Sequence, residues 1–249
     1  MALTEDQIER YSRQIVLPIV GGRGQQRLLD SSVLLVGCGG LGCPVALGLA
    51  GAGVGRIDLI DDDCVALSNL HRQLAFTEDD IGRTKVSVLA AAMRSRSPAQ
   101  VLEHAMRAQA DNLPDLLKDV DLVIDGSDNF SSRFAVADAC VDAGVALISG
   151  AVTAQAGQIF AQPAGGQPCY RCLFEREPKH APSCDADGVL PGATLNVAGM
   201  MLQWSLLALM RRPELPWSHL LQGDLVSGVW RSLALNARSD CRCREPAPR

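Results

Sequence analysis

Short apolar runs alternate with longer helix-forming stretches between residues 33 and 149. The runs at residues 33–37, 56–60, 101–104, 121–125 and 145–149 are short and mostly rich in Val, Ile and Leu, which predicts buried strands. The stretches between them predict helices at residues 44–52, 83–95, 112–118 and 132–143. Strands that alternate with helices favour parallel pairing with right-handed crossovers. The pattern therefore predicts an α/β fold with a Rossmann-like, mostly parallel sheet.

The pattern changes near residue 156. Shorter strands are expected at residues 157–163 and 228–235, one apolar helix is expected at residues 196–210, and Pro and Gly become frequent. Such a change favours an antiparallel C-terminal extension of the same sheet. We therefore expect a single domain.

Glycines cluster directly after the first predicted strand. Gly37, Gly39 and Gly42 form a Gly-x-Gly-x-x-Gly pattern that leads into a helix. Such a loop lets a phosphate approach the backbone and the positive end of the helix. Asp61 follows the next strand, where a carboxylate can accept hydrogen bonds from ribose hydroxyls. These residues predict a nucleotide site and leave open whether the nucleotide is a dinucleotide or ATP; a tight turn without a ligand is the alternative.

Polar side chains beyond Asp61 favour ATP. An enzyme that cleaves the α–β bond of ATP needs several phosphate-directed donors, because charge builds up on the leaving pyrophosphate. The candidates are Ser68, Asn69, Arg72, Gln73 and Lys85. Asp128 and Asn129 follow the strand at residues 121–125, at the edge where open α/β sheets bind ligands. Asp128 is a candidate Mg²⁺ ligand, with a helix cap as the alternative.

Nine cysteines indicate metal ligands or reactive thiols rather than a disulfide framework. Cys169 and Cys172 form a Cys-x-x-Cys pair, and Cys241 and Cys243 form a second pair. Two such pairs can close a tetrahedral zinc site; a redox dithiol is the alternative.

The other five cysteines fall into two groups. Cys184 lies in a polar, Pro-rich stretch and is a candidate nucleophile, or else an incidental surface cysteine. The remaining four are expected to be buried small hydrophobes. They are Cys38, Cys43, Cys64 and Cys140.

Composition narrows the classes of function. The chain has 249 residues, of which 47% are hydrophobic and 20% charged, as is typical of a globular protein. A formal net charge of −5 and the lack of a long Lys/Arg run disfavour nucleic acid and anionic membranes as partners. Residues 1–13 do not read as a secretory signal, and the apolar segment at residues 198–210 is too short to span a bilayer. We therefore expect a cytoplasmic protein.

These motifs together resemble the family of ThiF, MoeB and HesA, bacterial relatives of ubiquitin-activating enzymes. The resemblance runs nearly end to end, through residues 10–15, the glycine loop and residues 67–73, 125–129, 169–172 and 230–235. It implies one ThiF-type adenylation domain over residues 1–249. Within it, residues 1–30 would be an N-terminal helical arm, residues 31–155 the nucleotide-binding core, and residues 156–249 the antiparallel extension with the cysteine cluster.

The resemblance implies that MgATP adenylates the C-terminal glycine of a small ubiquitin-fold sulfur-carrier protein and that pyrophosphate leaves. Asp61 would hold the ribose, and the backbone of Gly40 would contact ATP. The implied phosphate, magnesium and supporting residues are Asn69, Arg72, Lys85, Asp128, Gln73 and Asn129. A terminal carboxylate, with a pKa near ~3.5, is already ionised and needs no general base. Catalysis would then be alignment and charge neutralisation.

The resemblance also implies partners. The counterpart of Arg13 reaches into the active site of the other subunit, which implies a homodimer. Cys184 would form an acyl disulfide with the carrier, and the four paired cysteines would bind structural zinc, although Cys241 and Cys243 are one residue closer than the usual Cys-x-x-Cys. No sulfurtransferase domain is expected to follow, so a separate protein would donate the sulfur.

Several functions stay open at this point. The residues look closest to the thiamine-thiazole branch with a ThiS-like carrier, and a MoaD-like carrier for molybdopterin synthesis is the alternative. A dinucleotide-dependent oxidoreductase would explain only the glycine loop and Asp61. A non-catalytic carrier-binding module would keep the fold without the chemistry.

Overall fold

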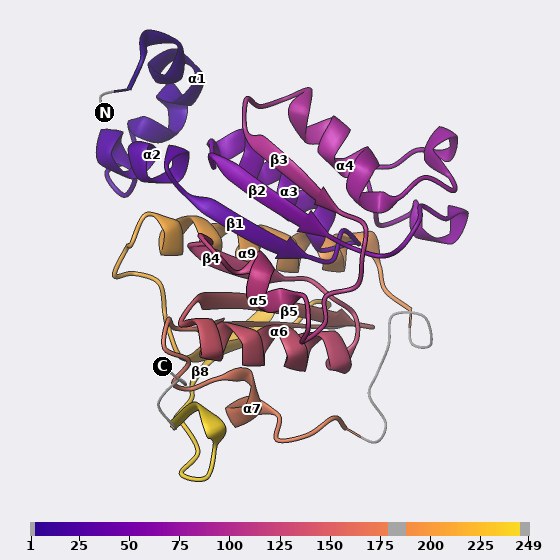
Figure 1. The fold of residues 1–249 in the computed structure, drawn as a ribbon, viewed down its shortest axis with the longest axis vertical. Helices are drawn as coiled ribbons and strands as arrows, with labels where there is room; N and C mark the ends of the chain where they lie inside the picture. The colour runs from indigo at the N-terminus through magenta and orange to yellow at the C-terminus, as the bar shows by residue number, and fades with distance from the viewer. Residues whose placement is uncertain (1–2, 179–187, 245–249) are drawn as a thin grey trace.

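An eight-stranded sheet forms the centre of the computed structural model, which describes residues 3–178 and 188–244 (Figure 1). The strand order is β3-β2-β1-β4-β5-β6-β7-β8. The strands are β1 (Ser32–Val36), β2 (Arg56–Ile60), β3 (Gln100–His104), β4 (Leu122–Asp125), β5 (Ala146–Thr153), β6 (Ala156–Gln162), β7 (His219–Asp224) and β8 (Val229–Ala234). β3, β2, β1, β4 and β5 pair in parallel, and β6, β7 and β8 continue antiparallel from β5. The predicted fold class is confirmed.

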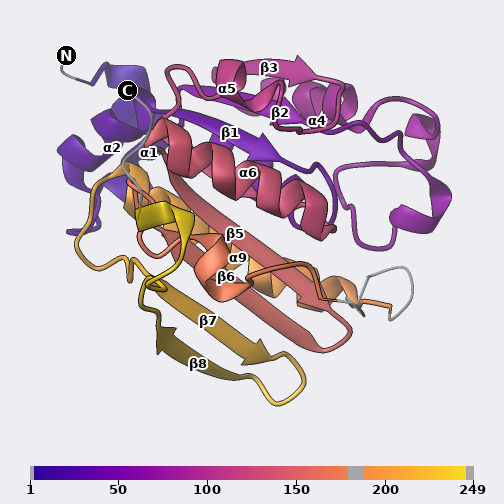
Figure 2. The ribbon, with the colours of Figure 1, turned by 60° about the horizontal axis from the view of Figure 1, so that its bottom comes forward.

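Helices cover both faces of the sheet. They are α3 (Gly42–Ala52), α4 (Lys85–Arg94), α5 (Leu113–Leu116), α6 (Phe130–Ala143), α7 (Tyr170–Leu173) and α9 (Pro191–Leu209). Alternate residues of β1 point to opposite faces: Val33 and Leu35 join the core with α3, α4 and α9, whereas Leu34 joins the core with α5 and α6. Figure 2 shows α6 in front of the sheet and α9 behind it.

Two C-terminal elements differ from the sequence prediction. β7 was not expected, because its six residues contain Gly and Asp and no β-branched side chain. α9 starts at Pro191, five residues before the expected start, with Pro in its first turn. At 19 residues it is long and apolar enough to cross a membrane by length and composition, so the expectation of too short a segment is wrong. Half of it is buried, against α3, β5 and β6, as in a core helix.

The first two helices lie at the end of the sheet where β1 begins (Figure 1). They are α1 (Glu5–Ile15), which starts with a capping box between Thr4 and Gln7, and α2 (Gly21–Leu29). The side-chain amides of Gln14 and Gln25 both donate to the carbonyl of Ala52, at the C-terminal end of α3. The arm is thus fixed at the edge of the sheet opposite the glycine loop.

Candidate functional site

A cavity of about 300 Å³ lies where β1, β2 and β4 end. It therefore occupies the carboxyl edge of the parallel strands, where open α/β sheets bind ligands. The predicted residues that line it are Gly37, Gly39, Gly40, Asp61, Ser68, Asn69, Arg72, Gln73, Lys85, Asp128 and Asn129. Asp62, Asp63, Met106, Arg107 and Thr194 also line it, and no sequence motif had selected them.

The glycine loop is shaped by two close backbone contacts. Gly37 has a φ of +88°, and a Cβ there would lie 3.0 Å from the carbonyl carbon of Gly126. A Cβ on Gly42 would lie 1.8 Å from the carbonyl oxygen of Gly37. Gly42 does not line the cavity; its part is the close packing of helix on loop. At Gly39 a Cβ would meet only the amide nitrogen of Gln73, at 3.7 Å, so the backbone there is open to a ligand.

The carboxylate of Asp61 is held by the backbone on both sides. One oxygen accepts from the N–H of Cys38 in the glycine loop at 2.6 Å, and the other accepts from the N–H of Asp63 at 2.8 Å. Burial raises the pKa of Asp61 above its ordinary value, and the hydrogen bond from Cys38 and the charge of Lys85 counteract this rise. The carboxylate is thereby fixed beside the loop.

Lys85 is a buried cation at the start of α4. Its ammonium group donates to the carboxylate of Asp63 at 2.8 Å. Burial acts to lower the pKa of Lys85, but the bond to Asp63 and the charges of Asp61 and Asp128 outweigh it and raise that pKa. Lys85 is therefore charged at neutral pH.

A short 3₁₀ turn, η1 (Leu67–Asn69), positions the other predicted donors. Arg72 donates to the side-chain oxygen of Asn69 at 3.1 Å, and its aliphatic carbons pass 3.3 Å from where a Cβ on Gly40 would be. Gln73 is 2% exposed, and its side-chain oxygen has no hydrogen-bond partner among the described residues. An unpaired buried polar atom beside a cavity is the kind of group that a ligand or a water satisfies.

Asn129, rather than Asp128, caps α6. Its side chain accepts from the N–H of Ser132 at 2.8 Å, so the alternative that Asp128 is the helix cap is wrong. The exposed carboxylate of Asp128 has only a 3.3 Å contact from the Asn129 amide among the described residues. The carboxylate of Asp128 therefore keeps oxygen atoms that can bind a cation next to the glycine loop. Mg²⁺ beside a nucleotide takes few protein ligands, and one such carboxylate suits it.

A buried polar network that the sequence analysis missed supports this loop. The guanidinium of Arg133, 7% exposed, donates twice to the carbonyl of Ser127, at 2.6 and 3.1 Å. The fully buried Asp125 accepts from the N–H of Ser127 at 2.9 Å and from the hydroxyl of Ser149 at 3.1 Å. Burial raises the pKa of Asp125, and the charge of Arg133 counteracts it. These hydrogen bonds fix the backbone of Ser127, the residue just before Asp128.

Three predicted positions lie elsewhere. Arg13 is exposed on α1 and does not line the cavity of its own chain. Cys184 lies outside the described residues. Cys64 is exposed, so its predicted burial is wrong, because the loop after β2 carries it to the surface; Cys38, Cys43 and Cys140 are buried as predicted.

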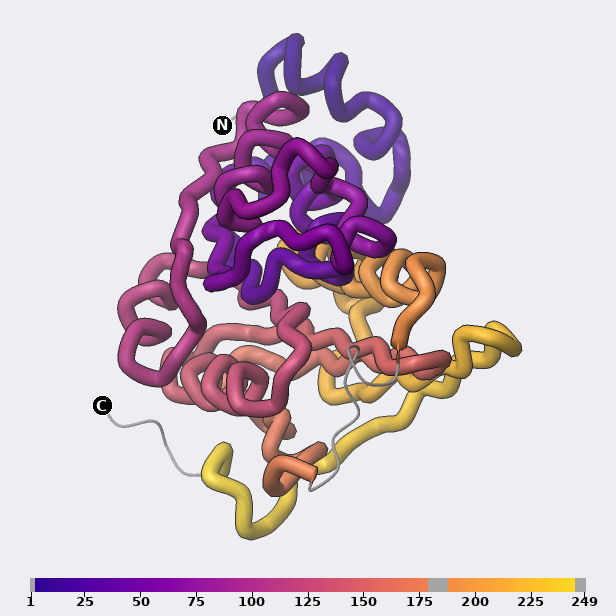
Figure 3. Tube along the Cα trace, turned by 90° about the vertical axis from the view of Figure 1, so that its right-hand side faces the viewer, coloured from indigo at the N-terminus to yellow at the C-terminus, as the bar shows by residue number. Residues whose placement is uncertain are grey.

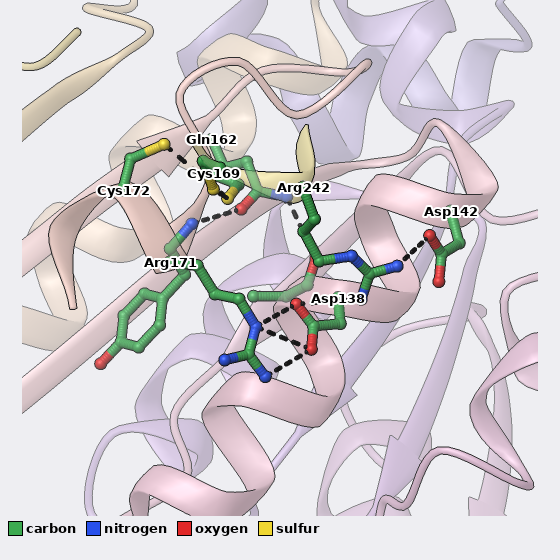
Figure 4. Close-up of polar contacts among 10 residues, drawn as sticks. Asp138, Asp142, Gln162, Cys169, Arg171, Cys172 and Arg242 are labelled. Atoms are coloured by element: carbon green, nitrogen blue, oxygen red, sulfur yellow. Dashed lines mark hydrogen bonds and ion pairs between the residues drawn. The ribbon is translucent and has the colours of Figure 1, made fainter. Parts of the chain in front are cut away.

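The four paired cysteines form one cluster, of which Figure 4 labels Cys169 and Cys172. Their sulfur atoms all lie within 4.8 Å of one another. The Sγ–Sγ distances are 4.0 Å for Cys169–Cys172, 3.5 Å for Cys169–Cys241 and 3.6 Å for Cys172–Cys243. Four sulfurs at about 2.3 Å from a tetrahedral zinc are about 3.8 Å apart. The shortened second pair therefore still fits a zinc ion.

The fold and the cavity define a nucleotide-binding type of α/β domain, with a cysteine cluster on its antiparallel half. The model of the ThiF family matches residues 11–244, and the chain belongs to that family.

Two curated relatives agree with this assignment. A sulfur carrier protein adenylyltransferase of Thermus thermophilus is 38% identical over 97% of this chain and 92% of its own length. The adenylyltransferase and sulfurtransferase MOCS3 of Sus scrofa is 42% identical over 96% of this chain but only 54% of its own length. The chain thus spans about half the length of MOCS3.

A solved structure shows the same fold at lower identity. Escherichia coli MccB, in a crystal structure with ATP, superposes with a TM-score of 0.80 at 22% identity, over 94% of this chain and 74% of that one. The resemblance extends over the parallel and the antiparallel halves of the sheet.

Proposed function

We propose that this chain is an ATP-dependent adenylyltransferase that activates the C-terminal glycine of a small ubiquitin-fold sulfur-carrier protein. The observation that carries the proposal is one cavity in which two cations, Arg72 and Lys85, face a glycine loop and the carboxylates of Asp61 and Asp128. A relative with this chemistry in its name covers nearly the whole chain.

In this proposal the carrier carboxylate attacks the α-phosphorus of ATP. A bond forms between the carboxylate oxygen and that phosphorus, the bond from the α-phosphorus to the bridging oxygen breaks, and pyrophosphate leaves with the electron pair. Arg72 and Lys85 would neutralise the charge that builds on the leaving group. Asp61 would orient the ribose, and the open backbone at Gly39 would admit the phosphates. Asp128 would hold Mg²⁺, which supplies further charge neutralisation when bound.

Two alternatives explain fewer of these contacts. A dinucleotide-dependent oxidoreductase would use the glycine loop and Asp61. It would give Lys85, Arg72 and Asp128 no role. A non-catalytic carrier-binding module needs the fold, but it has no use for two cations, Arg72 and Lys85, that line the same cavity. Both alternatives predict no pyrophosphate exchange.

We further propose a structural zinc ion at Cys169, Cys172, Cys241 and Cys243. The sulfur spacing supports it, the cluster joins the C-terminal segment to α7, and none of the four cysteines lines the cavity. The proposal excludes a redox role for these thiols. Zinc content by mass spectrometry, with and without chelator treatment, tests it.

A homodimer is part of the proposal, because Arg13 is exposed and lies away from the cavity of its own chain. If Arg13 serves the site of the partner, Arg13→Ala and Arg72→Ala are both inactive alone. After subunits exchange between the two variants, mixed dimers contain one intact site. Recovery of activity on mixing supports the dimeric site, and continued inactivity contradicts it.

ATP–pyrophosphate exchange tests the main proposal. The assay is run under reducing conditions at neutral pH, because we expect a cytoplasmic protein. It is run separately with a ThiS-like and a MoaD-like carrier that end in Gly-Gly. Exchange with one carrier selects the pathway, and exchange with both makes the chain a shared activator. No exchange with either, with MgATP and zinc present, contradicts the proposal. Thiocarboxylate formation by Cys184→Ala, with a separate sulfur donor supplied, tests the acyl-disulfide role.

A further inference from the structure

Each cysteine pair encloses an arginine, and both arginines bind the same carboxylate. Arg171 lies within Cys169–Cys172, and Arg242 separates Cys241 from Cys243. Arg171 donates to Asp138 from two nitrogens, at 2.8 to 3.0 Å. Nη1 of Arg242 lies 3.3 Å from Oδ1 of Asp138, an oxygen that also accepts from Nε of Arg171. Figure 4 shows these side chains meeting on α6, beside the sulfur cluster.

A second carboxylate extends the contact. Asp142 follows Asp138 by one helical turn on the same face of α6, and it accepts from Arg242 at 2.5 Å. Arg171 also lies over the ring of Phe134, with its guanidinium carbon 4.6 Å from the ring centroid. These contacts orient both arginines toward α6. Both cysteine pairs are thereby tied to the same helix.

The second pair is held by burial beside Cys169 and Val141 of α6 and by a few polar contacts. Its short turn, η3 (Arg242–Arg244), follows a stretch from Leu235 to Asp240 that forms no strand or helix. Figure 3 shows this C-terminal segment (yellow) passing beside α7. The amide of Gln167 donates to the carbonyl of Cys243 at 2.9 Å, and the N–H of Arg238 contacts the sulfur of Cys172 at 3.4 Å. Among the described residues, Arg242 makes the ion pairs that join this turn to α6.

We propose that Asp138 is a positioning residue for the cysteine cluster. It binds the arginine enclosed by each pair and brings the C-terminal pair to the first pair before a metal binds. Asp142 reinforces the contact to Arg242. This arrangement compensates for the shorter Cys-x-Cys spacing, because the backbone of Arg242 is fixed by its side chain rather than by a longer loop. The rate of zinc release rests on the proposed zinc site, but the ordering of residues 237–244 does not.

The test compares Asp138→Asn and Arg242→Gln with wild type and with Asp115→Asn. Asp115 is an exposed control on α5, whose ion pair is with Lys118. Arg242→Gln leaves the Asp138–Arg171 pair in place, so it tests the proposal even if Asp138→Asn folds poorly. Zinc release to a chromogenic chelator is measured first. Loss of outer-shell partners usually costs about 10–100-fold in metal affinity, so release from both variants is expected to be about 10-fold faster or more.

Salt and metal-free exchange give two further readouts. High salt is expected to speed zinc release from wild type more than from Asp138→Asn, because salt screens ion pairs that the variant lacks. In metal-free protein, backbone hydrogen exchange of residues 237–244 is expected to be faster in both variants than in wild type and Asp115→Asn.

The outcomes separate the two proposals. If wild type binds no zinc, the zinc site fails, and the exchange of residues 237–244 alone decides the role of Asp138. If both variants match wild type in that exchange, the positioning role is overturned, whether or not zinc binds. Faster exchange in the variants supports it in either case.

Discussion

The ammonium group of Lys85 lies 2.8 Å from a carboxylate oxygen of Asp63, which joins a buried cation to an exposed anion. The side chain of Lys85 is 6% exposed and that of Asp63 is 66% exposed. The pair raises the pKa of Lys85 against the effect of burial. A raised lysine pKa adds stability that is present below the unfolded pKa of about 10.4 and is lost as pH rises through the folded value.

Asp63→Asn is therefore expected to lower the pKa of Lys85, because burial then acts with less opposition. The alkaline limb of pyrophosphate exchange should move to lower pH, since the cation is lost sooner. The measurement is the exchange rate between pH 7 and pH 10.

The control for Asp63→Asn is Asp115→Asn, which removes an exposed aspartate–lysine pair outside the cavity. Its pH profile should match wild type. An unchanged alkaline limb in Asp63→Asn would show that the pair does not set the charge of Lys85.

Arg72 is predicted to act on the leaving pyrophosphate. Arg72→Ala removes the guanidinium that bonds to Asn69 at 3.1 Å, and loss of one such charge-stabilising donor usually costs about 10²–10³ in rate. Arg72→Lys should recover little of the rate, because lysine lacks the planar fork. The readout is kcat and KM for ATP in the exchange assay.

Arg83→Ala is the matched control for Arg72. Arg83 is 55% exposed, pairs with Asp80 and does not line the cavity. Its exchange rate and melting temperature should stay near wild type. An Arg72→Ala enzyme with wild-type kcat would exclude a role for this residue in the transition state.

The cavity-lining residues that could be predicted from the sequence are those whose placement follows from local backbone geometry. The glycine loop and Asp61 belong to one β-turn-α-β unit, so chain order already places them together. Lys85 could be selected as a phosphate-directed cation. Its pairing with Asp63 could not be predicted, because Asp61, Asp62 and Asp63 are equivalent in the sequence and differ only in how the loop turns.

The missed features depend on tertiary packing. Arg133 looks like a surface residue of α6, yet it is buried because it bonds to the carbonyl of Ser127. Thr194 reaches the cavity only because α9 begins early, at Pro191, and crosses to the glycine loop. Asp138 has no motif of its own, and its contact with both cysteine pairs requires the C-terminal segment to return to α6.

Two glycines of the loop should respond differently to alanine. Gly39→Ala places a methyl group in open space, so the fold is kept or stabilised by about 0.4–1 kcal/mol, while the methyl hinders the phosphates. Gly42→Ala places a Cβ 1.8 Å from a backbone oxygen and should destabilise the fold by about 1–3 kcal/mol. Thermal melts with and without ATP separate these effects. Weaker ATP stabilisation in Gly39→Ala, at an apo melting temperature that is unchanged or raised, is the expected signature of a phosphate loop.

The raised pKa of Asp61 predicts an acid limit for ATP binding. The folded state binds this proton more tightly than the unfolded chain does. Protonated Asp61 therefore contributes stability at low pH, and this contribution is lost as pH rises through the raised pKa. Ribose binding needs the ionised form. ATP affinity should therefore weaken on acidification at a pH above the ordinary aspartate value of about 3.9.

Calorimetric titration of wild type and Asp61→Asn with an ATP analogue, across the acid range, tests this limit. The side chain introduced by Asp61→Asn does not titrate, so the pH dependence of ATP affinity in this variant reports the titration of the nucleotide and of all other groups of the protein. The difference between the two curves belongs to Asp61. Parallel curves would mean that the Asp61 carboxylate, although fixed by the N–H of Cys38 at 2.6 Å, does not hold the ribose.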